Sequence, residues 1–317
     1  MDDIVITGNN LTIISTIKSY LHTQFHIKDL GDLKYFLGFE VARSKRGLVL
    51  NQRKYCIVIL SEFGLTGCKP APTPTNSSVK LNETDGDLLP DSTNYRRLIG
   101  KLLYLTHTRP DISCVVQQIS QFMTAPRTSH LNAAFRILRY LKNAPGQGLF
   151  YPVQNPHRLQ AFSDLDWATC NITRKSITGY CVFYGNCLIS WKSKKHNTVS
   201  RSSTEAEYRA LATLARELQW LKFIADNLSL NIPLLISTFC DNQSTIQLAK
   251  NPYFHERTKH IEVDCHLIRT KITEGLILLS HISSKHQLAD VFTKSLYPTP
   301  FTDNISKLGL INIYHPT

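Results

Sequence analysis

The chain has 317 residues, of which 42% are hydrophobic, and this is enough for more than one hydrophobic core. Its formal net charge of +12 favours a polyanionic partner, with nucleic acid first among them. No apolar run approaches the roughly 20 residues of a membrane-spanning helix, and the acidic start of the chain predicts no signal peptide. The eight cysteines form no C-x-x-C pair, which indicates reduced thiols in an intracellular compartment, cytoplasmic or nuclear, and argues against secretion.

Residues 1–67 have the element order of a small α+β unit. Asn10 is placed to cap a helix whose apolar residues recur at helical spacing as far as Phe25. Two strands, over residues 33–42 and 47–52, are predicted around a Lys-Arg-Gly turn, and a helix over 55–63 follows.

Residues 68–92 read as an extended linker, because prolines recur among small polar residues. Three helices are predicted over residues 93–148, the last over about 129–142. On that last helix, Arg136, Arg139 and Lys142 are candidates for contact with a duplex backbone, although a solvated basic face is the simpler interpretation.

A second break, rich in proline and glycine, covers residues 144–156, and the last unit is predicted over 157–317. Its order is three strands, a long helix over 204–228, a strand, two helices, a strand, and a last helix over 286–296. Residues 185–186, Gly-Asn, are expected to form the tight turn between the second and third strands. This order predicts an α/β unit with a mixed sheet and helices on its faces.

Four islands in this unit each carry an acid, and one acid from each can meet at one edge of the sheet: Asp164, Glu207, Asp241 and Asp290. Clustered carboxylates repel one another unless cations are bound, and hard oxygen ligands suit Mg²⁺, with Mn²⁺ as an alternative. A pair of such ions can hold both the attacking water and the leaving oxygen of a phosphodiester. The pattern is typical of a nuclease.

Two of the four positions have a competitor nearby. Asp164 and Asp166 lie on the same face of a strand, so strand geometry does not choose between them. Glu205 and Glu207 point about 200° apart on a helix, and Glu205 suits the helix start.

The islands resemble the ribonuclease H domain at the end of a copia-type (Pseudoviridae) retrotransposon Pol polyprotein. The segments that fit this pattern, in order, are Asp164-Leu165-Asp166-Trp167, Arg174-Lys175-Ser176, Ile189-Ser190-Trp191-Lys192-Ser193-Lys194-Lys195, Arg201-Ser202-Ser203-Thr204-Glu205-Ala206-Glu207-Tyr208, Cys240-Asp241-Asn242-Gln243, Arg257-Thr258-Lys259-His260-Ile261 and Gln287-Leu288-Ala289-Asp290. Upstream, other segments are similar to the trailing part of the reverse transcriptase: Lys28-Asp29-Leu30-Gly31, Tyr35-Phe36-Leu37-Gly38 and Thr108-Arg109-Pro110-Asp111-Ile112.

The resemblance implies a ribonuclease H-like, five-stranded mixed sheet for 157–317, preceded by a truncated reverse-transcriptase palm (1–67), the linker (68–92) and a helical thumb or connection (93–148). It implies an Mg²⁺-dependent endoribonuclease that cuts the RNA strand of RNA–DNA hybrids, and it favours Asp164 and Glu207 over their competitors. Its partners would be RNA–DNA hybrid or other nucleic acid and the remainder of the Pol polyprotein. Asp2 and Asp3 match the paired acids of the polymerase hairpin, but without a partner strand we expect no polymerase activity.

Basic and aromatic residues supply candidates for nucleic-acid contact: Trp191, Lys192, Lys194, Lys195, Arg257 and Lys259. A zinc site from His255, His260, Cys265 and His266 fits no compact spacing and is disfavoured. Two rival functions remain. One is a non-catalytic, nucleic-acid-binding remnant of a decayed element. The other is a transposase or integrase, which would use a compact acidic triad.

Overall fold

The structure is a computed structural model that describes residues 3–170, 172–250 and 262–314. The first elements are α1 (Leu11–Phe25), β1 (Tyr35–Phe36), β2 (Phe39–Ser44), β3 (Gly47–Asn51) and α2 (Arg53–Glu62). Asn10 caps α1 as predicted, because its Oδ1 accepts from the backbone N–H groups of Thr12 and Ile13 at 3.0 and 3.2 Å. The strand expected over 33–42 is split, since Leu37 and Gly38 both turn through positive φ.

The helical region consists of α3 (Thr93–Leu105), η1 (Pro110–Ile112), α4 (Ser113–Ser120) and α5 (Thr128–Asn143). At its centre Arg109 Nη2 lies 2.7 Å from Asp111 Oδ2, and both side chains are almost fully buried. Tyr140 Oη donates to the same carboxylate oxygen at 2.6 Å, and Arg109 Nη1 donates to Ala144 O at 2.9 Å. The Thr-Arg-Pro-Asp-Ile segment is therefore the buried polar joint of this region.

Residues 68–92 form an extended segment held along α5. Arg139 Nε donates to Lys69 O at 3.0 Å, and Arg136 Nη2 donates to Thr73 Oγ1 at 3.1 Å. Lys142 Nζ donates to Cys68 O. The three basic side chains that the sequence offered to a duplex backbone thus each donate a hydrogen bond to the linker.

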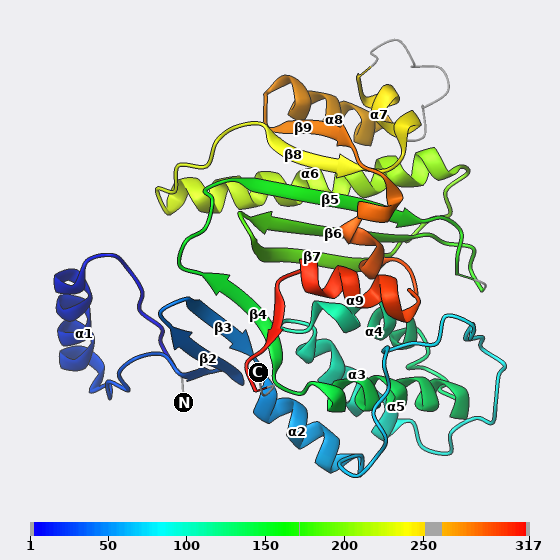
Figure 1. Cartoon of the computed structure of the whole chain (residues 1–317), viewed down its shortest axis with the longest axis horizontal. Coiled ribbons are helices and arrows are strands. Elements are labelled where there is room, and N and C mark those ends of the chain that lie inside the picture. The colour runs from blue at the N-terminus through cyan, green and yellow to red at the C-terminus, as the bar shows by residue number, and fades with distance from the viewer. Residues whose placement is uncertain (1–2, 171, 251–261, 315–317) are drawn as a thin grey trace.

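The second sheet has the order β7-β6-β5-β8-β9 and lies in the upper half of Figure 1. Its strands are β5 (Leu159–Asp166), β6 (Ile177–Tyr184), β7 (Cys187–Lys195), β8 (Ile236–Cys240) and β9 (Ile277–His281). Neighbours among β5, β6 and β7 are antiparallel, whereas β8 is parallel to both β5 and β9. Gly185 has φ 58° in the tight turn between β6 and β7, as its place in the sequence predicted. The strand order confirms the expected mixed, ribonuclease H-like sheet.

Helices cover one face of this sheet: α6 (Ser203–Asn227), α7 (Gln243–Lys250) and α8 (Glu262–Thr273). Apolar residues of these helices and of β5, β6, β8 and β9 form one buried cluster. The other face carries Phe162, Cys181 and Phe183, which belong to a second cluster continuous with the core of α3, α4 and α5. The helical region and the mixed sheet therefore share a hydrophobic core.

The chain after β9 differs from the expectation of a helix over 286–296. It forms two 3-10 turns, η3 (Ser284–His286) and η4 (Leu288–Phe292), and the last helix is α9 (Pro298–Lys307). The spacing of Leu288 and Val291 suits a 3-10 turn as well as an α-helix, and Gln287 Oε1 accepts from Ala289 N to start the turn. Asp290 accordingly lies on a 3-10 turn and not in the last helix.

The other sheet is antiparallel and has the order β1-β2-β3-β4-β10. Its last two strands, β4 and β10, come from later in the chain. β4 (Gln147–Pro152) lies within the predicted break at 144–156, which is a correction, and it pairs with β3 and with β10 (Leu310–Asn312). Figure 1 shows the red segment after α9 returning to this sheet beside β4. The expected boundary between the helical region (93–148) and the last unit (157–317) stays a prediction. A boundary there would place the paired strands β4 and β10 in different units. Within the part of the chain that the structure describes, no helix is both long enough and apolar enough to cross a bilayer.

Candidate active site

Three carboxylates meet at one edge of the mixed sheet. Asp164 lies near the end of β5, Glu207 near the start of α6, and Asp241 directly after β8. One ligand oxygen from each lies within 4.8 Å of the other two. The parallel pairing of β5 with β8 explains the meeting, because neighbouring parallel strands end at the same edge. In the described residues, this is the one cluster of three potential metal-ligating side chains.

The environment of Glu207 suits a bound cation. Its Oε2 is buried and has no hydrogen-bond partner. Burial, with the charges of Asp164 and Asp241, raises the pKa of Glu207 to about 9. A divalent cation would supply the missing partner and relieve the repulsion, and three carboxylates are the donor set that Mg²⁺ and Mn²⁺ accept.

Glu205 has a different place. Its backbone N–H donates to Ser202 Oγ at 3.1 Å, and its Oε2 accepts from the backbone N–H of Arg201 at 2.8 Å. This reciprocal arrangement is a capping box at the start of α6. Arg209 adds an ion pair of 2.8 Å to the other carboxylate oxygen. Of the two glutamates, Glu207 is the one that joins the carboxylate cluster.

Asp290 reaches the site through a lysine. Lys294 Nζ lies 2.9 Å from Asp290 Oδ1 and 3.1 Å from Asp164 Oδ2, so a single ammonium group bridges the two acids. Burial, followed by the charge of Asp164, raises the pKa of Asp290 to about 7. Lys294 was not among the residues predicted for the site, although its position four residues after Asp290 was an available signal.

Hydroxyl groups from the segment after β9 orient two of the acids. Thr293 Oγ1 donates to Asp164 Oδ2, and Ser284 Oγ donates to Asp241 Oδ2 at 2.8 Å. The same segment is anchored by Gln287, whose Nε2 donates to the backbone oxygen of Ser163 at 2.9 Å. Thr293 and Ser284 carried no sequence signal, since serine and threonine are common in loops, whereas Gln287 belongs to a segment that fits the family pattern.

A glycine lets this segment approach the sheet so closely. Gly179 on β6 is the register partner of Asp164 on β5. A Cβ atom at Gly179 would lie 2.6 Å from Thr293 Cγ2 and 2.8 Å from Phe292 Cβ. Position 179 therefore needs glycine because η4 and Thr293 pack directly onto the strand.

Asp166 lies beside the cluster and is not part of it. It lines an adjoining pocket, and Thr169 Oγ1 donates to its backbone oxygen at 3.3 Å. Burial, opposed by Lys294 and assisted by Asp164, raises the pKa of Asp166 to about 6. The structure thus separates two aspartates that strand alternation left equivalent.

The remaining candidates are scattered. Trp191, Lys192, Lys194 and Lys195 all lie on β7, where Trp191 packs against the shared core and Lys194 is exposed. Asp3 is exposed, whereas Asp2, Arg257, Lys259, His255 and His260 lie outside the described residues. Cys265 and His266, the two described residues of the disfavoured zinc site, lie on α8, and Cys265 is buried.

Comparison with known proteins places the chain. Residues 1–77 match the family described as reverse transcriptase (RNA-dependent DNA polymerase). The Pol polyprotein from transposon RE1 of Arabidopsis thaliana is 42% identical over 99% of this chain, and the one from transposon TNT 1-94 of Nicotiana tabacum is 35% identical over 93%. The alignments take in 21% and 23% of those polyproteins, so the chain spans about a fifth of their length.

A shorter relative is an uncharacterized mitochondrial protein of Arabidopsis thaliana, 43% identical over 69% of this chain and 91% of that protein. Among solved structures, LC11-RNase H1 overlaps 43% of this chain and 93% of its own, with 15% identity and a TM-score of 0.34. That protein has also been solved with an RNA/DNA hybrid. The fold is assigned from the strand order and register of the mixed sheet, and not from the overlap with LC11-RNase H1. The chain belongs to the copia-type retrotransposon Pol family, within which it spans the end of the reverse transcriptase and the ribonuclease H-like domain.

Proposed function

We propose that this chain is a Mg²⁺-dependent endoribonuclease of the ribonuclease H type, which cleaves the RNA strand of RNA–DNA hybrids. The observation that carries the proposal is the meeting of Asp164, Glu207 and Asp241, with an unpartnered buried oxygen on Glu207. These three side chains would hold the metal, either Mg²⁺ or Mn²⁺, and Asp290 would complete the ligand set.

When bound, the ions would lower the pKa of the attacking water and stabilise the leaving oxygen. The chain's own residues prepare the site for them. Thr293 and Ser284 each donate a hydrogen bond that fixes the rotamer of one aspartate. The ammonium of Lys294 offsets the charges of Asp164 and Asp290 in the free protein. A preorganised ligand set of this kind reduces the reorganisation needed when substrate arrives.

Recognition of a hybrid would combine backbone charge with strand identity. The exposed Lys194 and the half-buried Lys192 provide cations on β7, an edge strand of the mixed sheet, and Arg257 and Lys259 are further candidates. Selectivity for the RNA strand would rest on its 2′-hydroxyl groups. In an intact element, the remainder of the Pol polyprotein would be the covalent partner. Polymerase activity is not part of this proposal.

One observation favours a second function, a non-catalytic nucleic-acid-binding remnant. The ammonium of Lys294 already bridges two of the four acids, so part of the charge that would attract a metal is neutralised within the chain. A basic protein with this fold could then bind hybrid without cutting it.

The test offers the purified chain four labelled substrates: a hybrid labelled on its RNA strand, the same hybrid labelled on its DNA strand, duplex RNA and duplex DNA. We expect cleavage of the hybrid's RNA strand alone, in Mg²⁺ and not in EDTA. Binding of the hybrid without cleavage in any metal would support the remnant. Cleavage of duplex DNA at a comparable rate would contradict the proposed substrate.

A further inference from the structure

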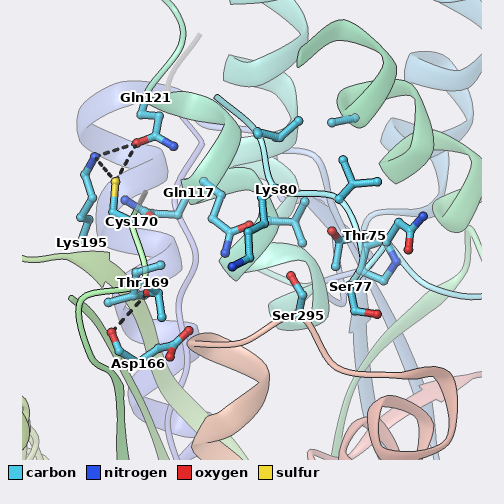
Figure 2. A pocket seen from close by; sticks show the side chains of 18 of the residues that line it. Thr75, Ser77, Lys80, Gln117, Gln121, Asp166, Thr169, Cys170, Lys195 and Ser295 are labelled. Atoms are coloured by element: carbon cyan, nitrogen blue, oxygen red, sulfur yellow. Dashed lines mark hydrogen bonds between the residues drawn. The ribbon is translucent and has the colours of Figure 1, made fainter. Parts of the chain in front are cut away.

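A groove of about 770 Å³ opens beside the carboxylate cluster. Its walls come from the linker at residues 74–81, helices α4 and α5, and the loop after β5, and we call it the linker groove. Two of its lining residues are close in the chain to the site, since Asp166 lies two residues after Asp164 and Ser295 one residue after Lys294. Figure 2 shows Lys80 and Gln117 near the middle of the groove.

The groove is strongly basic. Of the described residues that line it, one is acidic, Asp166, and five are cationic: Lys80, Arg136, Arg139, Arg174 and Lys195. Amide and hydroxyl groups also line it, among them those of Gln117, Gln121, Thr75 and Ser77 (Figure 2), together with apolar side chains. A basic groove with such donors and acceptors suits a phosphate backbone with attached sugars and bases.

Trp167 gives the groove an aromatic surface. Its side chain lines the groove and is 47% exposed, although it is a large apolar residue. The indole Nε1 donates to the backbone oxygen of Ser200 at 3.3 Å, which restrains the ring. An exposed, restrained aromatic ring among cations is the arrangement on which single-stranded nucleic acid stacks its bases.

We propose that the linker groove binds an unpaired nucleic-acid strand that continues from the hybrid at the carboxylate cluster. A base would stack on Trp167, and Lys80, Arg174 and Lys195 would contact phosphates. The volume is that of a pocket for a small ligand, so it holds a short stretch of one strand and not a duplex. The position of the strand relative to cleavage rests on the proposed function, but binding in the groove does not require metal or cleavage.

The first experiment uses Trp167 as its own reporter. The chain has three tryptophans, so the Trp191→Phe/Trp220→Phe variant leaves one indole. In EDTA, a single strand of about eight nucleotides, either oligo-dT or oligo-rU, should quench its fluorescence, and a blunt duplex of the same length should not. Equal quenching by the blunt duplex, or none by either strand, would overturn the proposal.

Substitutions then assign the binding to the groove. We expect Lys80→Ala/Arg174→Gln to weaken strand binding about tenfold, because two phosphate contacts are lost. The matched control is Lys307→Ala, which removes an exposed cation of α9 outside the groove and should leave affinity unchanged. Equal affinity of the groove variant and the control would place the strand elsewhere.

The second measurement needs no substitution. Cys170 lines the groove, with its Sγ 3.7 Å from Lys195 Nζ, whereas the half-buried Cys68 does not line it. A bound strand should slow alkylation of Cys170 by a maleimide and leave that of Cys68 unchanged, as read by peptide mass spectrometry. Unaltered alkylation of Cys170 at saturating oligonucleotide would contradict the proposal. The fluorescence and alkylation measurements are both made in EDTA, so they do not depend on cleavage. If the chain fails to cleave hybrid, the groove can still bind a strand. If the chain cleaves hybrid but the groove binds no strand, only the inference about the groove is refuted.

Discussion

Lys294 Nζ lies 3.1 Å from Asp164 Oδ2 and 2.9 Å from Asp290 Oδ1, and so places a positive charge between two acids of the candidate active site. The lysine follows Asp290 by four residues, and Asp164 is 130 residues earlier in the chain. The ammonium group therefore fastens the segment after β9 to the central strand of the sheet. Its positive charge also reduces the net negative charge that the site presents to a metal.

Removing this charge should make the free protein depend more on metal. In EDTA, we expect Lys294→Met to lower the free energy of unfolding by roughly 1–3 kcal/mol, because charge-assisted hydrogen bonds to two carboxylates are lost. Added Mg²⁺ should raise the melting temperature of the variant more than that of the wild type, because ligand binding stabilises the native state. Lys307→Met on the exposed surface of α9 is the control. Identical melting temperatures in EDTA and identical shifts with Mg²⁺ would show that Lys294 does not balance the site.

The buried pair in the helical region should matter more for stability. Asp111→Asn leaves Arg109 buried without its counter-charge and weakens the bond from Tyr140. We expect a loss of about 3–5 kcal/mol in the free energy of unfolding, as for other broken buried ion pairs. Urea denaturation measures it, with the exposed Asp303→Asn on α9 as control. A loss below about 1 kcal/mol would mean that water or a rearranged side chain replaces the partner.

His196 predicts a pH dependence of stability. Burial, together with the charge of Arg209, lowers the pKa of His196 to about 4, whereas an unfolded histidine titrates near 6.5. Between these values the unfolded chain binds more protons, so the contribution of His196 is fully present above about pH 6.5 and is lost as the pH falls toward 4. The free energy of unfolding should fall more between pH 7.5 and 5 in the wild type than in His196→Gln, by roughly 1 kcal/mol or more. Parallel pH profiles for the two proteins would contradict this assignment.

The sequence predicted the mixed sheet well because its signals were local. Alternating β-branched and aromatic residues defined β6 and β7, and Gly185 marked their turn. Three of the four acids lie where the ends of regular elements place them together. Strand order accounts for the meeting of Asp164 and Asp241, whereas the choice of Asp164 over Asp166 and of Glu207 over Glu205 came from the family resemblance.

The rest depends on partners that are distant in the sequence. β4 is a six-residue segment ending in a proline, and its strand character comes from pairing with β3 and β10. The fourth acid was placed on a helix because apolar spacing does not distinguish a 3-10 turn from an α-helix over five residues. Lys294, Thr293 and Ser284 become site residues only once the segment after β9 crosses the sheet at Gly179.

The core shared by the helical region and the mixed sheet predicts which fragments of the chain are stable. Phe301 of α9 packs edge-on against Tyr140 of α5 with ring centroids 5.7 Å apart, and β10 pairs with β4. A fragment of residues 93–317 keeps these contacts and a fragment of 157–317 loses them. We expect the longer fragment to have the higher melting temperature, since the shorter one exposes the apolar face of α9. Equal melting temperatures and equal solubility would show that the expected boundary near residue 157 is also a boundary in stability.

The most direct test of the account is single-turnover cleavage of an RNA–DNA hybrid by the wild type and by Glu207→Gln in Mg²⁺, with hybrid affinity measured in EDTA. The amide keeps the shape of Glu207 but removes the charge that would hold the metal. We expect a loss of about 10²–10³-fold in cleavage rate, corresponding to several kcal/mol, with hybrid affinity within about twofold of the wild type. The exposed Asp226→Asn on the same helix should cleave as the wild type does. Near-normal cleavage by Glu207→Gln would contradict the assignment of the carboxylate cluster as the catalytic metal site.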